Sequence, residues 1–552
     1  MTLSSRNVAE ALLLRLKQLG VDWFIANPGT EFASIIRGFA DLPACDVPTP
    51  VLAPHEFLAV SIAYGQYLVT QRPQAVMTHA NVGAANALIG LMGAARMNVP
   101  LIYIAGMTSS SERARLGRRD KLIHWSQDSK DLLGLCREYV KWEVRLDDPS
   151  AVCDALDRAY AIAMSPPCGP VAIGITRDVL MSDAMAPLPC NVQVRPTSTL
   201  APNADELGQI GRWLNDAKRP LAITNRLGQD VDAVAKLCAA SERHGMGVIT
   251  PDDFYCSFPP AHAHHLGFSY HGIVREADFV LVLDTDAPWY PMDQGPNAAV
   301  RVAHVGADPL FEDLPLRSHR GDAFLRCSPR SFLDALCRAD PNLAALADRR
   351  AWVQSVNAAR TLPETHTALT ADTVAAALNE VLDDQTVLFN ELGLRAEYLP
   401  RRRPGGYFRS GATSSLGWSI GCALGYTMAA RDKLALAVIG DGVFYLSPLL
   451  GALAVATEQN VALAIIVLNN GGMASIEATV RDFYPLTPAN LALTRLPQSA
   501  IHLEKCADFV SGLALRASTR DEFPSALQQA VSFARERRRP VIVNALLSTP
   551  SA

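Results

Sequence analysis

The feature that most constrains the fold of this chain is the regular alternation of short apolar segments with longer segments of helical pattern. In the N-terminal part, the apolar segments 73–79 and 99–106 flank a helix-like stretch at 82–97. Strands that are apolar along their whole length are buried on both faces, as in parallel sheets covered by helices on each side. The same alternation returns in 219–306 and again in 385–547. We therefore predict an α/β chain with three tandem doubly wound parallel-sheet domains.

The length of the chain and two interruptions of the pattern suggest where these domains begin and end. The 552 residues correspond to three or four domains at about 150 residues each. A proline-rich stretch at 185–206 is typical of a linker, and a long helical connection at 339–382 precedes the last group of strands. We predict domains at 1–185, 200–340 and 370–552.

The composition limits the kinds of partner that the chain is expected to have. Its hydrophobic fraction of 49% and charged fraction of 19% are sufficient for large buried cores. A net charge of −5 argues against a general nucleic-acid or anionic-membrane binder, and no apolar run approaches the length of a membrane span. The eleven cysteines form no Cys-x-x-Cys pair, and no signal-peptide pattern is present. We therefore expect a cytoplasmic protein with reduced thiols.

Two apolar runs near the C-terminus end in polar, glycine-rich sequences, Gly-Asp-Gly at 440–442 and Asn-Asn-Gly-Gly at 469–472. If the runs are neighbouring strands, Asp441 and Asn470 lie at the carboxyl edge of the sheet, where open α/β sheets bind ligands. Glycines let backbone N–H groups approach an anion, and the start of a helix after Gly442 favours phosphate. Carboxylate and amide oxygens suit Mg²⁺. The pattern therefore predicts a site for a magnesium–diphosphate group.

Each of these two sequences is also common in turns, so a turn without any ligand is the alternative interpretation of either one alone. Their occurrence together, each directly after an apolar run, favours the binding site. The chain has no Gly-x-Gly-x-x-Gly that opens a helix after a strand and no Gly-x-x-x-x-Gly-Lys-Ser/Thr. A nicotinamide site and a P-loop nucleotide site are therefore disfavoured.

The two glycine-rich sequences together resemble the signature of thiamine diphosphate enzymes. More narrowly, the whole chain is similar to the family of pyruvate decarboxylase, benzoylformate decarboxylase and acetolactate synthase. This resemblance names the three domains, in order, as pyrimidine-binding, central and diphosphate-binding. It implies Mg²⁺ ligands at Asp441, Asn470 and the backbone oxygen of Gly472, and cofactor contacts at Gly440 and Gly442.

The first domain is expected to supply a glutamate to the other end of the cofactor. Glu56 precedes an apolar helix-like segment, so its carboxyl could be withdrawn from water and share a proton. An ordinary first-turn glutamate, stabilised by the helix dipole, is the alternative. In the family that the chain resembles, a glutamate at this position meets N1′ of the aminopyrimidine and promotes the imino tautomer, which deprotonates C2 of the thiazolium. The resemblance also implies that Asn86 binds the cofactor.

The resemblance further implies which side chains meet the substrate. His79 ends a predicted strand, where benzoylformate decarboxylase has a histidine that handles protons; a structural hydrogen bond is the alternative. Thr30 stands where that enzyme has a serine in contact with the substrate carboxylate, although Thr30 also suits a helix N-cap. Glu56, His79 and Thr30 are the predicted catalytic residues. The other predicted pocket residues are Gln127, Met473, Ser475 and Ile476.

Two residues in the third domain are implied to support a bent cofactor. Leu416 would lie between its two rings, and the carbonyl of Ser414 would accept a hydrogen bond from its 4′-amino group. Ordinary core packing is the alternative for Leu416. Gly417, Gly421 and Gly425 are spaced by four, which predicts a helix that packs closely against a neighbour.

The implied function is the non-oxidative decarboxylation of a small 2-oxo acid, dependent on thiamine diphosphate and Mg²⁺, with carboligation to a second carbonyl as a further outcome. An acetolactate synthase-like carboligase is the alternative within the same class, and a non-catalytic cofactor-binding scaffold is the alternative of another class. Pyruvate decarboxylases have a catalytic glutamate where this chain has Ile476; Glu477 follows one position later, about 100° around a helix.

The resemblance also bears on assembly and on a second cofactor. Active sites in the family form between two chains, which implies a homodimer or homotetramer here, with the sites at the dimer interface. The resemblance to acetolactate synthase also implies FAD in the central domain. Nothing in the sequence supports FAD binding.

Overall fold

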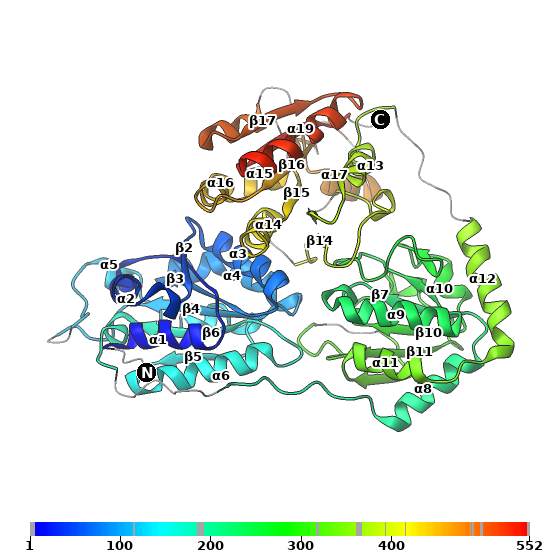
Figure 1. The fold of residues 1–552 in the computed structure, drawn as a ribbon, viewed down its shortest axis with the longest axis horizontal. Coiled ribbons are helices and arrows are strands. Elements are labelled where there is room, and N and C mark those ends of the chain that lie inside the picture. The colour runs from blue at the N-terminus through cyan, green and yellow to red at the C-terminus, as the bar shows by residue number, and fades with distance from the viewer. Residues whose placement is uncertain are drawn as a thin grey trace. The chain divides into compact units, whose positions relative to one another are not determined.

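The structure is a computed structural model that describes residues 6–113, 116–184, 193–315, 319–359, 367–391, 393–413, 416–485, 487, 491–496 and 501–548. Its strands form three parallel, six-stranded sheets with helices interspersed among the strands (Figure 1). This arrangement confirms the predicted α/β fold class. No helix in the described ranges is long and apolar enough to cross a membrane.

The first sheet has the strand order β2-β1-β3-β4-β6-β5. Its strands are β1 Trp23–Asn27, β2 Thr49–Leu52, β3 Gln74–His79, β4 Leu101–Met107, β5 Glu143–Leu146 and β6 Val171–Thr176. Its helices are α1 Val8–Gln18, α2 Ala33–Asp41, α3 Glu56–Thr70, α4 Ala80–Arg96, α5 Ile123–Ser126, α6 Val152–Met164 and α7 Arg177–Leu180. Helices α1 and α6 share one apolar core with the sheet, and α3 and α4 cover the other face (Figure 1). The strand order reverses between β1 and β3, and open α/β sheets bind ligands at such a reversal.

The second sheet has the order β12-β11-β10-β7-β8-β9, with its reversal between β7 and β10. Its strands are β7 Pro220–Thr224, β8 Gly247–Ile249, β9 His265–Gly267, β10 Phe279–Leu283, β11 Arg301–Gly306 and β12 Ala323–Arg326. Its helices are α8 Ala204–Asp216, α9 Val231–His244, α10 Ile273–Glu276, α11 Pro329–Arg338 and α12 Leu346–Ala359. Separate apolar cores lie on its two faces, as expected for a doubly wound sheet.

The third sheet has the order β14-β13-β15-β16-β18-β17. When the strands of each sheet are numbered from the first strand of that sheet, the third sheet has the same strand order as the first. Its strands are β13 Thr386–Asn390, β14 Tyr407–Arg409, β15 Leu434–Gly440, β16 Leu463–Asn469, β17 Leu513–Ala517 and β18 Val541–Leu546. Its helices are α13 Ala371–Val381, α14 Trp418–Ala429, α15 Asp441–Leu446, α16 Leu449–Glu458, α17 Ala474–Phe483 and α19 Glu522–Arg537.

The chain divides into two compact units that do not coincide with the three sheets. One unit comprises 1–197, 410–517 and 528–546, and the other comprises 198–409, 518–527 and 547–552. The three domain boundaries expected from the sequence therefore stay predictions.

Helices α3 and α14, both in the first unit, approach each other so closely that glycine is required at their contact. A Cβ atom added at Gly425 would overlap the backbone carbonyl oxygen of Ile62. One added at Gly65 would overlap the carbonyl oxygen of Cys422. The backbones of the two helices are thus in direct contact at both positions. This contact confirms the close packing predicted from the glycines of α14. This contact holds the helix that begins at Glu56.

Candidate active site

Asp441 and Asn470 lie at the carboxyl ends of two neighbouring strands, β15 and β16, as the sequence predicted. Asp441 is only 3% exposed, and its carboxylate joins the two loops. Its Oδ2 accepts hydrogen bonds from the backbone N–H groups of Gly471 at 2.8 Å and Gly472 at 3.1 Å. Its Oδ1 accepts another from Gly442 at 2.9 Å. The two glycine-rich sequences therefore form one structural site.

The surroundings of Asp441 suit a cation and an anionic group. Burial raises the pKa of its carboxyl, and the three backbone N–H groups oppose that effect; a bound cation would favour the charged form further. A Cβ atom at Gly440 or Gly442 would meet nothing within 4 Å, so open space lies beside the carboxylate. The amide oxygen of Asn470 accepts from Gly472 N–H at 3.1 Å. These donors and this space fit Mg²⁺ with a diphosphate.

The predicted metal site does not depend on a cluster of acidic or imidazole side chains. No three His, Cys, Asp or Glu side chains among the described residues gather in a way that could hold a metal ion. The predicted ligands are instead one carboxylate, the Asn470 amide and a backbone oxygen of Gly472. Mg²⁺ sites of this kind take most of their remaining oxygens from substrate phosphates and water.

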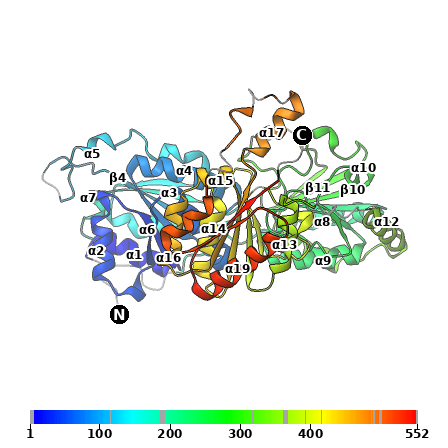
Figure 2. The same ribbon diagram turned by 90° about the horizontal axis from the view of Figure 1, so that it is seen from above.

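The predicted pocket residues Met473, Ser475 and Ile476 lie at the start of α17. No residue of α17 is buried, and Ile476 is 46% exposed. Figure 2 shows α17 standing away from the strands of its own sheet. These side chains are thus free within this chain to face a ligand or another surface, and their role in the pocket stays a prediction.

Glu477 is turned toward the segment that follows α17. Its Oε1 accepts a hydrogen bond from the hydroxyl of Thr494 at 2.9 Å and lies 3.3 Å from Nε of Arg495. The glutamate is therefore engaged elsewhere, as expected from its position one residue beyond Ile476.

The cofactor-supporting turn before α14 is described only in part. Ser414 lies outside the described residues. Leu416 is half-buried in the turn, and Gly417 follows it with a φ of +105°. A Cβ atom at Gly417 would lie 2.6 Å from Cβ of Ser447. The backbone next to Leu416 therefore has a conformation that requires glycine at position 417. The placement of Leu416 between the two rings of the cofactor stays a prediction.

Glu56 is the first residue of α3 and is 7% exposed. Its Oε2 accepts a hydrogen bond from the side-chain amide of Asn86 on α4 at 3.0 Å. The helix is capped by His55, whose Nδ1 accepts from Phe57 N–H at 3.1 Å. The two predicted cofactor-binding residues of the first domain are thus in direct contact, and the carboxyl is largely withdrawn from water.

His79 lies between two acceptor groups at the point where the strand order of the first sheet reverses. It ends β3, and Glu31 follows the neighbouring strand β1. Nδ1 of the ring is 2.5 Å from Oε2 of Glu31, and Nε2 is 2.9 Å from Oε1 of Gln127. Both ring nitrogens thus face oxygens that can only accept. The Glu31 carboxylate raises the pKa of His79, although burial opposes it. The geometry therefore favours an imidazolium.

The backbone around His79 and Glu31 is shaped for this pair. A Cβ atom at Gly29 would overlap Nδ1 of His79, and one at Gly106 would come within 2.5 Å of Oε1 of Glu31. Ala80, directly after His79, has a φ of +43°. That conformation is uncommon for alanine and is typically found where function constrains the backbone.

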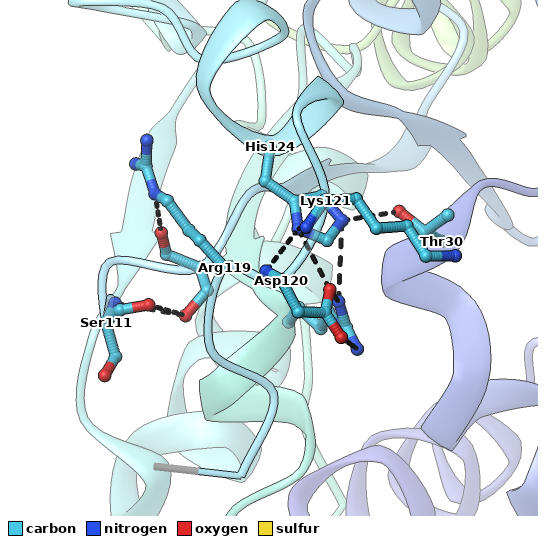
Figure 3. Close-up of polar contacts among 8 residues, drawn as sticks. Thr30, Ser111, Arg119, Asp120, Lys121 and His124 are labelled. Carbon is cyan, nitrogen blue, oxygen red and sulfur yellow. Dashed lines mark hydrogen bonds and ion pairs between the residues drawn. The ribbon is translucent and has the colours of Figure 1, made fainter. Parts of the chain in front are cut away.

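Thr30 contacts a histidine that the sequence analysis did not select. Its hydroxyl oxygen lies 3.1 Å from Nε2 of His124, which is 3% exposed (Figure 3). Thr30 does not act as a helix cap, because the N-cap of its short 3₁₀ turn is Gly29 and that of α2 is Phe32. The helix N-cap interpretation of Thr30 was therefore wrong.

Two charged or polar partners were missed from the sequence, and each carried a weak signal. Glu31 directly follows Thr30 at the end of a predicted strand. His124 lies three residues before Gln127, in a segment without a strand or helix pattern. Only the fold brings these side chains next to His79 and Thr30.

The comparison with protein families matches both ends of the chain. The model for "Thiamine pyrophosphate enzyme, N-terminal TPP binding domain" matches residues 6–134. The model for the corresponding C-terminal TPP binding domain matches residues 393–545. These two regions contain Glu56, His79, Asp441 and Asn470, and together they make up about half of the chain.

Known proteins resemble the chain over almost its whole length. Benzoylformate decarboxylase of Pseudomonas aeruginosa is 27% identical over 96% of this chain and 96% of the relative. The acetolactate synthase large subunit of Corynebacterium glutamicum is 23% identical over 97% of this chain and 86% of the relative. The crystal structure of benzoylformate decarboxylase from Polynucleobacter necessarius superposes with a TM-score of 0.80 at 20% identity, and covers 98% of this chain and 99% of that one. This structural likeness concerns the fold.

Proposed function

Because the chain belongs to the thiamine pyrophosphate enzyme family, we propose that it is an enzyme that uses thiamine diphosphate and Mg²⁺ to decarboxylate a small 2-oxo acid without oxidation. The observation that carries this proposal is the pairing of His79 with Glu31. A histidine held in its charged form is a proton donor, and protonation after the loss of CO₂ releases an aldehyde. The likeness to the benzoylformate decarboxylase of Pseudomonas aeruginosa supports the same outcome.

The chain's own residues divide the work between the two ends of the cofactor. Asp441, Asn470 and the backbone oxygen of Gly472 would hold Mg²⁺ and, through it, the diphosphate, with Gly440 and Gly442 leaving room beside it. Bound thiamine diphosphate supplies the electron sink for the charge that remains when CO₂ departs. At the other end, Glu56 would hold or release a proton at its carboxyl, whose orientation is fixed by the hydrogen bond from Asn86.

On the substrate side, Thr30 would donate a hydrogen bond to the carboxylate, and His79 would supply a proton. The Nε2–H of His79 now donates to Gln127, so substrate must take the place of that amide oxygen to receive the proton. Met473, Ser475 and Ile476 would form a mostly apolar wall, with Leu416 and the carbonyl of Ser414 supporting the cofactor. Exclusion of water by such a wall would protect the reacting charge.

The proposal also covers assembly and location. We infer a homodimer or homotetramer with active sites at the dimer interface, in the cytoplasm, with neither nucleic acid nor membrane as a partner. FAD binding by the second sheet stays a hypothesis; its strand order is that of dinucleotide-binding folds.

A panel of aliphatic and aromatic 2-oxo acids tests the proposal. Purified protein with thiamine diphosphate and MgCl₂ should release CO₂ and the matching aldehyde from at least one of them, and chelation of the metal should stop the reaction. Formation of acetolactate from pyruvate would instead favour the acetolactate synthase-like carboligase, which the Corynebacterium glutamicum relative supports. Bound cofactor with no consumption of any 2-oxo acid would support the non-catalytic scaffold.

A further inference from the structure

A buried polar side chain interrupts the apolar strand β18 in the first unit, close to the predicted metal site. Asn544 is fully buried. Its partner in the strand register, Val467, and Ile542, two residues earlier on the same face, are buried and apolar. A buried amide without hydrogen-bond partners costs free energy, so the partners of Asn544 are informative about its role.

Asn544 belongs to a chain of hydrogen bonds that ends at the loop after β16. Its Nδ2 donates to Oε2 of Glu504 at 2.8 Å, and its Oδ1 accepts from Nδ2 of Asn469 at 3.1 Å. Oδ1 of Asn469 in turn accepts from the backbone N–H of Gly471 at 3.2 Å. Asn469 pairs with Leu546, two residues beyond Asn544, so the two amides share one face of the sheet. We name Glu504, Asn544 and Asn469 the polar relay.

The loop end of the polar relay fixes the direction of its hydrogen bonds. The N–H of Gly471 can only donate, so Asn469 turns its oxygen to Gly471 and its NH₂ group to Asn544. Asn544 then turns its own NH₂ group away from the loop, where it needs an acceptor. Glu504 supplies that acceptor.

The other end of the polar relay requires the same direction, because Glu504 is held in its charged form. Glu504 lies in the 3₁₀ helix η10, Leu503–Val510, and is 4% exposed. Burial raises the pKa of its carboxyl, but hydrogen bonds, among them those of Asn544 and His502, and the charge of Arg516 outweigh burial and lower the pKa. Oε1 lies 2.9 Å from Nδ1 of His502 and 4.0 Å from Nη1 of Arg516, and those two nitrogens are 2.9 Å apart. Whichever of them donates to Oε1, Oε2 remains the acceptor for Asn544.

The loop that the polar relay contacts carries two of the predicted metal ligands. Gly471, between Asn470 and Gly472, has a φ of +72°, a conformation that favours glycine. Its N–H is shared between Oδ2 of Asp441 at 2.8 Å and Oδ1 of Asn469 at 3.2 Å. Asp441 accepts from three backbone N–H groups, and Mg²⁺ would compete with them for the roughly four lone pairs of the carboxylate. The polar relay is thus an anchor of this loop that uses no predicted metal ligand.

We propose that Glu504 and Asn544 are positioning residues of the predicted metal site, which hold the loop of Asn470 and Gly472 in place through Asn469 before Mg²⁺ binds. A loop that is fixed beforehand loses little conformational entropy on binding, so its affinity for the metal is higher. This inference rests on the metal site of the proposed function. It adds two residues that act on the metal only through the loop.

The Mg²⁺ concentration that supports half-maximal binding of thiamine diphosphate to the full chain tests the polar relay. Asn544→Leu should raise this concentration about tenfold, equivalent to about 1.4 kcal/mol. The effect stays moderate because the carbonyl of Gly471 also accepts from the N–H of Leu496 at 2.8 Å. Val543→Ala, at a fully buried position on the other face of β18, is the matched control. It should leave the Mg²⁺ requirement unchanged even where it lowers the melting temperature.

Substitutions of Glu504 test whether an acceptor is what the polar relay needs. Glu504→Met removes the acceptor and should raise the Mg²⁺ requirement about tenfold, whereas Glu504→Gln keeps an acceptor oxygen and should change it less than about threefold. The double variant Glu504→Met, Asn544→Leu should be no worse than Asn544→Leu alone, because both changes break one chain. Should Asn544→Leu fail to fold, the comparison of Glu504→Met with Glu504→Gln keeps the test available.

Hydrogen exchange of the cofactor-free protein tests the same anchor without metal or turnover. Peptides that span Gly471 and Gly472 should exchange faster in Asn544→Leu and Glu504→Met than in the wild type. Val543→Ala and Glu504→Gln should leave their exchange unchanged. A merely structural role predicts lower melting temperatures with an unchanged Mg²⁺ requirement. That result, equal exchange of the loop, or additive losses in the double variant would each overturn the inference, even in an active decarboxylase.

The outcomes separate this inference from the proposed function. Faster exchange of the loop and a raised Mg²⁺ requirement, in a protein whose wild type consumes no 2-oxo acid, would defeat the proposed decarboxylation and leave the polar relay standing. A wild-type protein that binds no thiamine diphosphate at any Mg²⁺ concentration would overturn the metal site and this inference together.

Discussion

Replacement of Gly65 by alanine should separate helices α3 and α14 and weaken the site that α3 helps to form. The added methyl carbon would overlap the carbonyl oxygen of Cys422 and lie 2.8 Å from the backbone nitrogen of Tyr426. Ordinary contacts of a Cβ atom begin near 3.4 Å. Because the atoms on the other side belong to a helix backbone, no side chain can rotate to make room.

The size of the effect follows from two opposing terms. Overpacking of a well-packed contact costs about 1–3 kcal/mol, and displacement of helix backbone lies at the upper end of that range. Alanine is better than glycine inside a helix by about 1 kcal/mol. We therefore expect a net loss of about 2 kcal/mol in the free energy of unfolding. Since α3 begins at Glu56, the variant should also bind thiamine diphosphate more weakly.

Urea denaturation and titration with thiamine diphosphate measure both effects. Gly211→Ala is the matched control, because it lies in a helix and a Cβ atom there meets nothing within 4 Å. The control should be as stable as the wild type or about 1 kcal/mol more stable. A Gly65→Ala protein as stable as this control would refute the backbone contact between α3 and α14.

Three further predictions concern buried charges and the space around His79. Glu31→Gln should lower the pKa of His79, so the alkaline limb of the pH profile of kcat/KM should move to lower pH. In the wild type, the charged pair of His79 and Glu31 is fully formed below 6.5, the pKa of histidine in the unfolded chain. The pair is lost as the pH rises through the raised pKa of His79 in the folded protein. An unchanged pH profile would contradict this. Gly29→Ala should push the ring of His79 aside and reduce kcat at least about tenfold. The affinity for thiamine diphosphate should be unchanged. Normal turnover by this variant would argue against a role for the His79 ring. Arg402→Met should destabilise the protein by about 3–5 kcal/mol, because it leaves Asp253 buried without the guanidinium that lies 3.0 Å away. Chemical denaturation measures this loss in the free energy of unfolding. A smaller loss than in a control variant that breaks a solvent-exposed ion pair would contradict the prediction.

The sequence predicted the interior of each sheet and missed its edges. The apolar segments at 73–79 and 99–106 and the two runs that lead into Gly-Asp-Gly and Asn-Asn-Gly-Gly are all inner strands, namely β3, β4, β15 and β16. The edge strands were not found. They are β2, β5, β9, β12, β14 and β17. An inner strand is buried on both faces and needs an unbroken apolar run, whereas an edge strand such as Thr49–Leu52 is exposed at three of its four residues.

The two halves of the candidate site differ in how far sequence could predict them. Asp441 and Asn470 follow inner strands directly, so their meeting at one sheet edge was accessible from the order of segments. The neighbours of His79 and Thr30 were not, because Glu31 lies in a 3₁₀ turn and His124 in an isolated helical turn. Such segments have no periodicity that predicts their direction, and only the surrounding fold determines it.

The central claim is that Asp441 and Asn470 bind magnesium and the diphosphate of the cofactor. Isothermal titration of the wild-type protein and of Asp441→Ala and Asn470→Ala with thiamine diphosphate, with and without MgCl₂, tests it most directly. We predict binding by the wild type that requires Mg²⁺, loss of that binding in both variants, and an unchanged far-ultraviolet spectrum. Equal affinity in the wild type and both variants, or binding that is indifferent to Mg²⁺, would contradict the account.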